Sequence, residues 1–367
     1  MKAIAYTRPL DINAPDALVD VDLPVPQASG RDLLVKVRAI SVNPVDTKIR
    51  ASVAPDHGEY KVLGWDAVGE VVAVGDGVSL FEVGDSVWYA GDLTRPGSNA
   101  EYQLVDERIV GKKPMSLSDV EAAAMPLTAI TAWELLFDRL GFAAQLPTGV
   151  TSYTDGFTET GEAARILVVG AAGGVGSILV QLAKKLTGAT VIGTASRAKS
   201  ENWVKELGAD HVINHHQPML PQLQALGIEQ VTHVISLTHT GEHFHQLVEV
   251  LAPQGKLALI DDPKEGLDIL ELKTKSISLH WEFMYTRSMF GTGDMQKQHD
   301  LLTALSQLID RGVVQSTLGE HYGAINAENL IRAHKQIESN RSVGKIVLEG
   351  FAAQKIAVMG SRFDMIG

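Results

Sequence analysis

The spacing of apolar residues divides the chain into a strand-rich first part and a second part in which strands and helices alternate. Up to about residue 125 the apolar positions recur every second residue, as in residues 35–39, where valine and alanine alternate with lysine and arginine. This period is typical of half-buried strands. Turns such as Gly75-Asp76-Gly77 follow at short intervals, and one helix is expected after Asn43-Pro44. The first part is therefore predicted to be a β-rich domain.

In the second part the pattern changes to that of a parallel sheet covered by helices. Residues 166–169 form a continuous apolar run, as expected for a strand buried on both faces. The segment after it places Val175, Ile178 and Leu182 on one helical stripe. Later runs, such as residues 231–237, are again separated by helix-length segments. The predicted fold class is α/β, a doubly wound parallel sheet beside the β-rich domain.

Two amphipathic helices and a closing strand are predicted near the end of the chain. Residues 301–309 have helical apolar spacing, Asn326 is a good N-cap for a second helix, and residues 344–348 form the last strand. Residues 146–161 are polar and are expected to form an exposed loop without chemistry that we can name. The tail, residues 351–367, has no assigned structure.

Composition excludes several classes of protein. Hydrophobic residues make up 45% and charged residues 21% of the 367 residues, which is ordinary globular usage. The net charge of -12 disfavours nucleic acid or an anionic membrane surface as the main partner. No apolar run approaches the length of a membrane span or a signal peptide, so we expect a cytoplasmic enzyme without a membrane partner. The absence of cysteine excludes disulfides, thiolate zinc sites and cysteine nucleophiles.

A glycine-rich turn carries the main chemical signal. It reads Ala171-Ala172-Gly173-Gly174-Val175-Gly176 and lies between the apolar run and the helical stripe. Glycines are needed where the backbone approaches a pyrophosphate and where a helix packs closely on a strand, and the helix N-terminus offers free N–H groups to the phosphates. A purely structural turn is the alternative, and an alanine replaces the first glycine of the usual pattern. The residues predicted to bind a dinucleotide are Ala172, Gly173, Gly174, Val175 and Gly176.

The end of the following strand indicates which dinucleotide is bound. About twenty residues after the glycine turn an NAD site normally presents an acidic residue, whereas an NADP site presents a cation. Here the strand ends Thr194-Ala195-Ser196-Arg197, without a carboxylate. Ser196 and Arg197 can supply a hydroxyl and a guanidinium to a 2′-phosphate, although a solvated surface arginine is the alternative. The predicted cofactor is NADPH.

Five further motifs are spread over nearly the whole chain: residues 41–46 (SVNPVD), 64–71 (GWDAVGEV), 97–102 (GSNAEY), 125–132 (MPLTAITA) and 343–345 (VGK). With the glycine turn, they make the chain resemble the medium-chain dehydrogenase/reductase superfamily. Within it, the chain resembles the quinone oxidoreductase branch, which includes zinc-type alcohol dehydrogenase-like proteins that lack the zinc ligands.

The resemblance implies a domain organisation and three site residues. A GroES-like catalytic domain is expected at residues 1–127, completed by residues 292–367, and a Rossmann NADPH-binding domain at residues 128–291, with the active site in the cleft. By the same resemblance, Asn43 lies near the nicotinamide, Thr128 contacts the ribose and phosphate region, and Lys345 reaches the cleft from the returning strand.

The resemblance also raises the question of zinc. Zinc-dependent members hold the catalytic metal with a cysteine in the first motif and a His-Glu pair in the second. In this chain Asn43 and Trp65-Asp66 stand at those positions, so we expect no metal. His239-Thr240-Gly241-Glu242-His243 matches the H-x-x-E-H spacing of some zinc peptidases. Because it follows an apolar strand and contains glycine, a loop is expected there instead of a metal-binding helix.

Without a metal ligand set, the natural reaction is hydride delivery from NADPH to an electron-poor carbonyl or quinone substrate. The protein then supplies orientation, a dry cleft and a hydrogen-bond donor to the developing negative charge. Asn43 is the best candidate donor, with Tyr60 and Tyr285 as further candidates. A turn amide and partly buried tyrosines are the structural alternatives.

Trp65, Asp46 and Asp66 also lie in the motifs, and each has a functional and a structural interpretation. Trp65 is predicted to form an aromatic wall of the catalytic site together with residues 283–285, against the alternative of core packing. Asp46 and Asp66 are expected to brace the backbone more than to act as acids. Two other functions stay open: a zinc-dependent alcohol dehydrogenase, and an NADPH-binding sensor or structural protein with little turnover.

One late strand indicates the assembly. Ile277, Leu279, Trp281 and Phe283 alternate along it, in a region where the superfamily commonly pairs two sheets edge to edge. A homodimer is therefore predicted. The alternative is an internal strand with one buried face.

Overall fold

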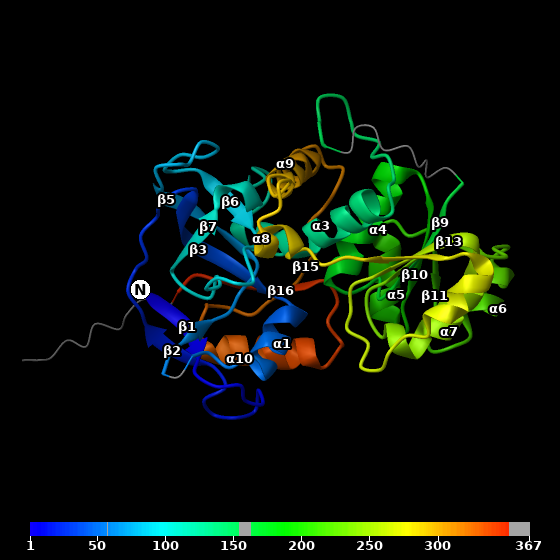
Figure 1. Ribbon diagram of the computed structural model, residues 1–367, viewed down its shortest axis with the longest axis horizontal. Coiled ribbons are helices and arrows are strands. Elements are labelled where there is room, and N and C mark those ends of the chain that lie inside the picture. Colours follow the sequence, from blue (N-terminus) through cyan, green and yellow to red (C-terminus); the bar gives the residue numbers. More distant parts are fainter. Residues whose placement is uncertain (57, 154–162, 352–367) are drawn as a thin grey trace, which may run out of the picture.

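The computed structural model describes residues 1–56, 58–153 and 163–351 of the chain (Figure 1). The second half of the polar loop expected at residues 146–161, and nearly all of the unassigned tail, lie outside the described residues. Within the described ranges, a β-rich part occupies one side of the molecule and a parallel sheet with its helices occupies the other.

The N-terminal part is built of short strands, as its period of two predicts. Its strands are β1 (Lys2–Tyr6), β2 (Val19–Asp22), β3 (Asp32–Val42), β4 (Lys61–Val62), β5 (Ala67–Val74), β6 (Ser86–Tyr89), β7 (Tyr102–Asp106) and β8 (Val110–Lys112). The helix expected after Asn43-Pro44 is α1 (Pro44–Ser52), and a 3-10 turn, η1 (Glu107–Ile109), precedes β8. β1 forms a small sheet with β2 and β4.

The end of the chain returns to this part. The returning elements are α9 (Lys297–Asp310), β15 (Leu318–His321), α10 (Ala327–Glu338) and β16 (Lys345–Glu349). The larger sheet has the order β15-β16-β3-β5-β6-β8, and β7 also pairs with β3. Asn326 caps α10 as predicted, since its side chain accepts a hydrogen bond from the Asn329 N–H at 2.8 Å. The antiparallel pairing of β16 with β3 places the start of β16 beside the end of β3.

The second part is a six-stranded parallel sheet. Its strands are β9 (Arg165–Val169), β10 (Thr190–Thr194), β11 (His211–Ile213), β12 (Val231–Ser236), β13 (Leu251–Leu259) and β14 (Ser278–Trp281). Its helices are α4 (Gly174–Thr187), α5 (Ala198–Glu206), α6 (Met219–Ala225), α7 (Thr240–Val250) and the 3-10 segment η3 (Ile269–Lys275). The strand order is β11-β10-β9-β12-β13-β14, so the chain adds strands on one side of β9 and then, from β12 onward, on the other side. Doubly wound sheets bind their ligands at this switch between β9 and β12. The predicted α/β fold class is confirmed.

Short helices in the middle of the molecule join the two parts. They are α2 (Asp119–Ala123), α3 (Pro126–Trp133), the π-helix η2 (Glu134–Arg139) and α8 (Thr286–Phe290). Figure 1 shows α3 between the β-rich part and α4, which it contacts. One buried apolar cluster runs from Trp88 in β6 through Ile130 in α3 to Ile178 in α4. The two parts therefore share a core, which fixes the position of the residues between them. No helix in the described ranges is long and apolar enough to cross a membrane.

The segment that matches the H-x-x-E-H spacing differs from the prediction. His239 is the N-cap of α7 and adopts a left-handed backbone conformation, and residues from Thr240 onward are helical. The expectation of a loop is therefore wrong for residues 240–243. The helix starts there because the Asp261 carboxylate, two residues after β13, accepts hydrogen bonds from the N–H and hydroxyl of Thr240.

Candidate active site

The glycine turn joins β9 to α4 at the carboxyl edge of the parallel sheet. Gly173 is the N-cap of α4, and no side chain caps this N-terminus, so its first N–H groups are available to an anion. A Cβ on Gly176 would lie 2.4 Å from the Gly170 carbonyl oxygen, so this glycine lets the helix approach the strand. A Cβ on Gly173 would meet nothing closer than 3.4 Å, so the space in front of this residue is open. Such an open cradle fits a pyrophosphate.

Residues from three distant parts of the chain meet at this turn. A Cβ on Gly174 would lie 2.7 Å from Cδ of Lys345 and 3.1 Å from Cγ2 of Thr128, so both side chains pack against the turn. The Gly344 N–H donates to the Ala172 carbonyl oxygen at 3.0 Å, which fixes the start of β16 beside it. The structure thus brings together the glycine turn, Thr128 and Lys345.

The end of β10 lies beside the same turn. The Gly170 N–H donates to Oγ1 of Thr194 at 3.1 Å. Ser196 follows and is half-buried, whereas Arg197 is exposed. Arg197 Nη2 donates to the Arg341 carbonyl oxygen at 3.1 Å, in the segment that leads to β16. The role of Ser196 and Arg197 in binding a 2′-phosphate remains a prediction.

A buried polar cluster lies beneath the turn, between the two parts of the molecule. Asp66 is fully buried, and its Oδ2 accepts hydrogen bonds from Ser41 Oγ at 2.7 Å, Asn43 Nδ2 at 2.9 Å and Lys345 Nζ at 2.8 Å. Lys345 also donates to Asn43 Oδ1, and the Leu127 N–H at the start of α3 donates to Asp66 Oδ1 at 2.8 Å. The charges of the lysine and the aspartate are thus paired and their hydrogen bonds are made, as a buried ion pair requires.

The three predicted catalytic residues have different surroundings. Both ends of the Asn43 amide are engaged, by Asp66 and by Lys345. Trp65 is completely buried, and its indole N–H donates to the Asp92 carbonyl oxygen at 3.1 Å, which favours the alternative of core packing. Tyr60 is 48% exposed and lines a surface hollow of about 360 Å³, whose lining includes no residue of the buried cluster. Catalytic roles for the three residues stay predictions.

Sequence reasoning missed the pairing of Lys345 with Asp66 and undervalued Asp46. Asp46 Oδ2 accepts the Asn43 N–H at 2.7 Å, and burial raises the pKa of Asp46 to about 7, although this hydrogen bond and the Lys345 charge oppose the rise. The signal for the ion pair was available, because a lysine that opens an otherwise apolar closing strand must find a partner when buried.

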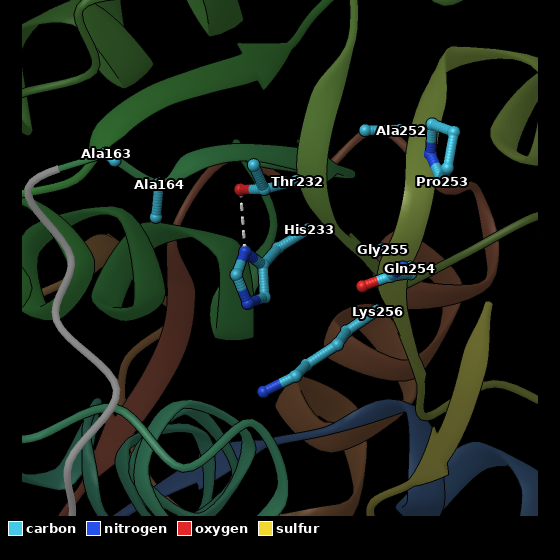
Figure 2. Close-up of a pocket in the computed structure, with 9 residues that line it drawn as sticks. All are labelled: Ala163, Ala164, Thr232, His233, Ala252, Pro253, Gln254, Gly255 and Lys256. Carbon is cyan, nitrogen blue, oxygen red and sulfur yellow. Dashed lines mark hydrogen bonds between the residues drawn. The ribbon is translucent and has the colours of Figure 1, made fainter. Parts of the chain in front are cut away.

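A second hollow, of about 260 Å³, lies away from this cluster. Figure 2 shows its lining: Thr232 and His233 at the start of β12, residues 252–256 of β13, and Ala163 and Ala164 before β9. These are the amino ends of the parallel strands, whereas the glycine turn follows the carboxyl end of β9. We therefore assign it no role in the site.

The buried cluster does not fit a catalytic zinc ion. The positions at which zinc-dependent members carry ligands hold Asn43, Trp65 and Asp66. The Lys345 ammonium already contacts the amide and the carboxylate, and the buried indole offers no lone pair. In the described part of the chain no three histidine, aspartate or glutamate residues are grouped so as to hold a metal.

Comparison with known proteins places the chain among dehydrogenases. Residues 29–115 match the family model of the alcohol dehydrogenase GroES-like domain, and residues 207–348 match that of the zinc-binding dehydrogenases. A zinc-type alcohol dehydrogenase-like protein of Staphylococcus aureus is 38% identical over 95% of this chain and 99% of its own length. A 2-methylene-furan-3-one reductase of Solanum lycopersicum is 30% identical over 95% of this chain and 79% of its own length.

Two solved structures of dehydrogenases and oxidoreductases are also similar to the chain. A Rhizobium etli CFN 42 protein, described as a zinc-dependent alcohol dehydrogenase, is 48% identical with a TM-score of 0.88, over 96% of this chain and 99% of that one. A quinone oxidoreductase of Coxiella burnetii is 26% identical with a TM-score of 0.75, over 95% of this chain and 99% of that one.

Proposed function

The chain belongs to the medium-chain dehydrogenase/reductase superfamily as a relative of the zinc-type alcohol dehydrogenase-like proteins, and from this membership we propose that it is an NADPH-dependent reductase of α,β-unsaturated carbonyls and quinones that works without a catalytic metal. Oxidoreductase activity follows from the family. The cofactor, the acceptor class and the independence from metal are the proposal.

The observation that carries the proposal is the position of Lys345. Its ammonium contacts Asn43 and lies 2.8 Å from the Asp66 carboxylate, and by the family resemblance these two residues stand at positions where zinc-dependent members carry metal ligands. A metal ion at that position would polarise an alcohol or a simple ketone as a Lewis acid. An ammonium whose hydrogen bonds go to neighbouring side chains gives much weaker help, so the acceptor itself must be electron-poor.

The residues that we propose to bind NADPH lie at or near the open glycine turn. The free N–H groups at the start of α4 would hold the pyrophosphate, Ser196 and Arg197 the 2′-phosphate, and Thr128 and Lys345 would lie beneath the ribose and nicotinamide. When bound, NADPH supplies a hydride to the electron-poor carbon of the acceptor. The chain itself orients the two molecules, excludes water and supplies the proton.

Two relatives support the acceptor class. The Solanum lycopersicum protein is named for a furanone whose exocyclic double bond is conjugated with a ketone, and the Coxiella burnetii protein is named for quinones. Both kinds of acceptor accept hydride without a Lewis acid.

Metal analysis combined with an activity panel tests the proposal. The purified protein is assayed for NADPH consumption with an enone and a quinone, and for alcohol oxidation with NADP⁺, before and after treatment with a chelator. We expect NADPH consumption that the chelator does not change, with far less than one zinc per chain. Alcohol oxidation that requires zinc would support the dehydrogenase instead, and NADPH binding without turnover would support a sensor.

A further inference from the structure

A group of charged side chains joins the π-helix η2 to the segment that follows the parallel sheet. Nη1 of Arg287, on α8, donates to the carboxylates of Glu134 and, at 3.0 Å, of Asp138, both on η2. Arg139 Nε, at the end of η2, donates at 2.7 Å to Oε2 of Glu282, the residue after β14. The two glutamates are 1% and 2% exposed. Helices of the π type are rare and often occur at functional sites.

Carboxyl groups outnumber cations in this group. Among the described residues it contains four carboxyl groups and three cations: Glu134, Asp138, Glu282 and Asp294 against Arg139, Arg287 and Lys297. A buried charge without a counterion is costly, and a carboxyl group in that situation takes up a proton instead. One proton brings the charges of the group into balance.

Glu134 and Glu282, the glutamate pair, are in contact with each other. Burial raises the pKa of Glu134 well above its ordinary value, and the charge of Glu282 and a hydrogen bond between the two side chains raise it further, against the charge of Arg287. Ionised carboxylates only accept hydrogen bonds, so a bond between two of them requires a proton on one. Arg287 and Gln298 both donate to Oε1 of Glu134, which leaves its Oε2 to carry the proton. Oε1 of Glu282 is buried and accepts from no described donor, so it can receive this bond.

The other carboxyl groups already have donors of their own. The Tyr153 hydroxyl donates to Oδ2 of Asp138 at 2.9 Å, and Arg287 donates to the same atom. Although burial raises the pKa of Asp294, hydrogen bonds from Thr292 and Arg287 lower it below the ordinary value. The proton therefore belongs to the glutamate pair.

We propose that the glutamate pair shares one proton and that this proton locks residues 282–298 onto η2. This segment leads from β14, the last strand of the parallel sheet, to α9, which packs on β8 in the β-rich part. When the proton is lost, two adjacent buried carboxylates repel each other and need water, so the contact opens. The lock is thus closed in acid and open in base, and it does not depend on the proposed reductase function.

Folding takes up a proton at this pair. In the unfolded chain both glutamates are ionised above about pH 4.3, whereas the folded protein retains the shared proton until the pH reaches the raised pKa of the pair. Because the folded state binds one proton more in this range, the contribution of the pair to stability falls as the pH rises. One proton corresponds to about a tenfold change in the unfolding equilibrium constant per pH unit.

Glu134→Gln tests the shared proton. The amide has nearly the shape of the protonated acid: its oxygen can accept from Arg287 and Gln298, and its Nε2 can donate to Glu282. We expect a smaller unfolding equilibrium constant than in wild type, by a factor that grows about tenfold per pH unit from about pH 5 up to the raised pKa. Urea unfolding of both proteins at the same pH measures this factor, and the comparison cancels the titration of all other groups.

The matched control is Glu107→Gln. Glu107 is also fully buried, but its oxygens accept only from described donors, namely Arg31 at 2.9 Å and the N–H groups of Ser79 and Leu80 at 2.8 and 2.7 Å. This glutamate needs its charge, so the control should raise the unfolding equilibrium constant about 10- to 100-fold. The increase should be the same at each pH above about 5, because the glutamate is ionised in both states there.

Two further readouts address the proton and the lock directly. In mildly acidic buffer, the infrared difference spectrum between wild type and Glu134→Gln should contain the carbonyl band of a protonated carboxyl group. Above the raised pKa, the amide hydrogens of residues 282–298 should exchange faster in wild type than in the variant at the same pH. Equal exchange in the two proteins would overturn the lock.

The behaviour of Glu134→Gln relative to the control decides whether the proton is there. A destabilisation of the same size at each pH, as expected for Glu107→Gln, would show an ionised Glu134 and overturn the proposal. Glu282→Gln is a second variant in case Glu134→Gln does not fold, because it leaves Glu134 alone with Arg287 and removes the need for a proton. Its unfolding equilibrium constant should fall relative to wild type by the same tenfold per pH unit, and a ratio that does not change with pH would again refute the shared proton.

Discussion

Buried residues from distant parts of the chain form the candidate site. Asp66 and Lys345 are 279 positions apart and meet because β16 returns to pair with β3. Both residues bind the amide of Asn43, and the side chain of Lys345 packs against the glycine turn. Substitutions of single residues around this turn therefore test the site.

Arg197 tests the predicted preference for NADPH. Replacing it by alanine should weaken NADPH binding about 10- to 100-fold, which is the effect of losing a charge-assisted hydrogen bond to the 2′-phosphate. NADH binding, which lacks that phosphate, should change little. Equilibrium titration of cofactor fluorescence measures both.

Lys199→Ala is the matched control for this change. Lys199 is exposed on α5, two residues further on, so the variant loses the same charge without losing the guanidinium. It should bind NADPH nearly as wild type does. Equal losses for NADPH and NADH in Arg197→Ala would refute the assignment of Arg197 to the 2′-phosphate.

The sequence predicts the residues of the site unevenly. The glycine turn could be predicted because its residues are contiguous and its neighbours are a strand and a helix. That a buried Lys345 needs a partner could also be predicted, but Asp66 as that partner could not, because the two residues are 279 positions apart in the chain. Resemblance to a family placed Lys345 in the cleft, but only the structure shows which atoms it contacts.

At the scale of elements, period and capping predicted most strands and helices, and the errors come from distant contacts. The N-terminus of α7 was expected to be a loop because it contains Gly241. The helix forms there because Asp261, 21 residues away, caps Thr240. The local pattern of residues 277–283 left open whether their strand is internal or at an edge, and in the described part of the chain β14 lies at the end of the strand order, beside β13.

The strand–turn–helix unit of β9 and α4 predicts different effects on protein stability when Gly176 or Gly173 is replaced by alanine. Gly176→Ala would place a Cβ 2.4 Å from the Gly170 oxygen, so it should destabilise the protein by about 1–3 kcal/mol, as overpacking does. Gly173→Ala meets no atom closer than 3.4 Å and should stay within about 1 kcal/mol of wild type. Because its methyl group would face the pyrophosphate, Gly173→Ala should still weaken NADPH binding.

Urea unfolding and cofactor titration check this pair. A Gly173→Ala protein that binds NADPH as wild type does would show that the open cradle is not the pyrophosphate site. A Gly176→Ala protein of unchanged stability would contradict the close packing of α4 on β9.

The contact between α1 and α10 predicts a loss of stability in acid. Arg50 Nε donates to Nδ1 of buried His334 at 3.3 Å, and burial together with the Arg50 charge lowers the pKa of His334 to about 3. The unfolded chain binds a proton at this histidine below about pH 6.5, whereas the folded protein does so only near pH 3, so stability falls as the pH falls between these values. The contribution is about 2 kcal/mol between pH 7 and pH 5, at about 1.4 kcal/mol per pH unit.

His334→Gln removes this titration and leaves an oxygen that can accept the Arg50 N–H. Its free energy of unfolding should therefore decline about 2 kcal/mol less than that of wild type between pH 7 and pH 5, measured by urea denaturation. His321→Gln, at an exposed histidine of β15, is the control and should follow wild type. Identical pH profiles for His334→Gln and wild type would count against a neutral buried histidine.

At the scale of the whole molecule, the free edge of the parallel sheet indicates how two chains assemble. Among the described residues β14 pairs only with β13, and large apolar side chains near it are exposed: Trp281 by 52%, Phe283 by 48% and Phe290 by 75%. An exposed apolar patch beside an open strand edge favours association. We propose a homodimer in which the two β14 edges pair.

Light scattering during size-exclusion chromatography tests the dimer. Wild type should elute with twice the chain mass of 39.5 kDa, and Trp281→Lys should shift the protein toward the monomer. A wild-type mass of one chain at all concentrations would rule out this assembly.

The central claim is that this molecule transfers hydride to an electron-poor acceptor without a metal. The measurement uses protein freed of metal by a chelator, NADPH that carries deuterium at both C4 positions of the nicotinamide, and a simple enone, with mass spectrometry of the product. We expect one deuterium on the β-carbon of the saturated ketone, at a rate that added zinc does not raise. A product without deuterium, or a transfer that appears only when zinc is restored, would contradict it.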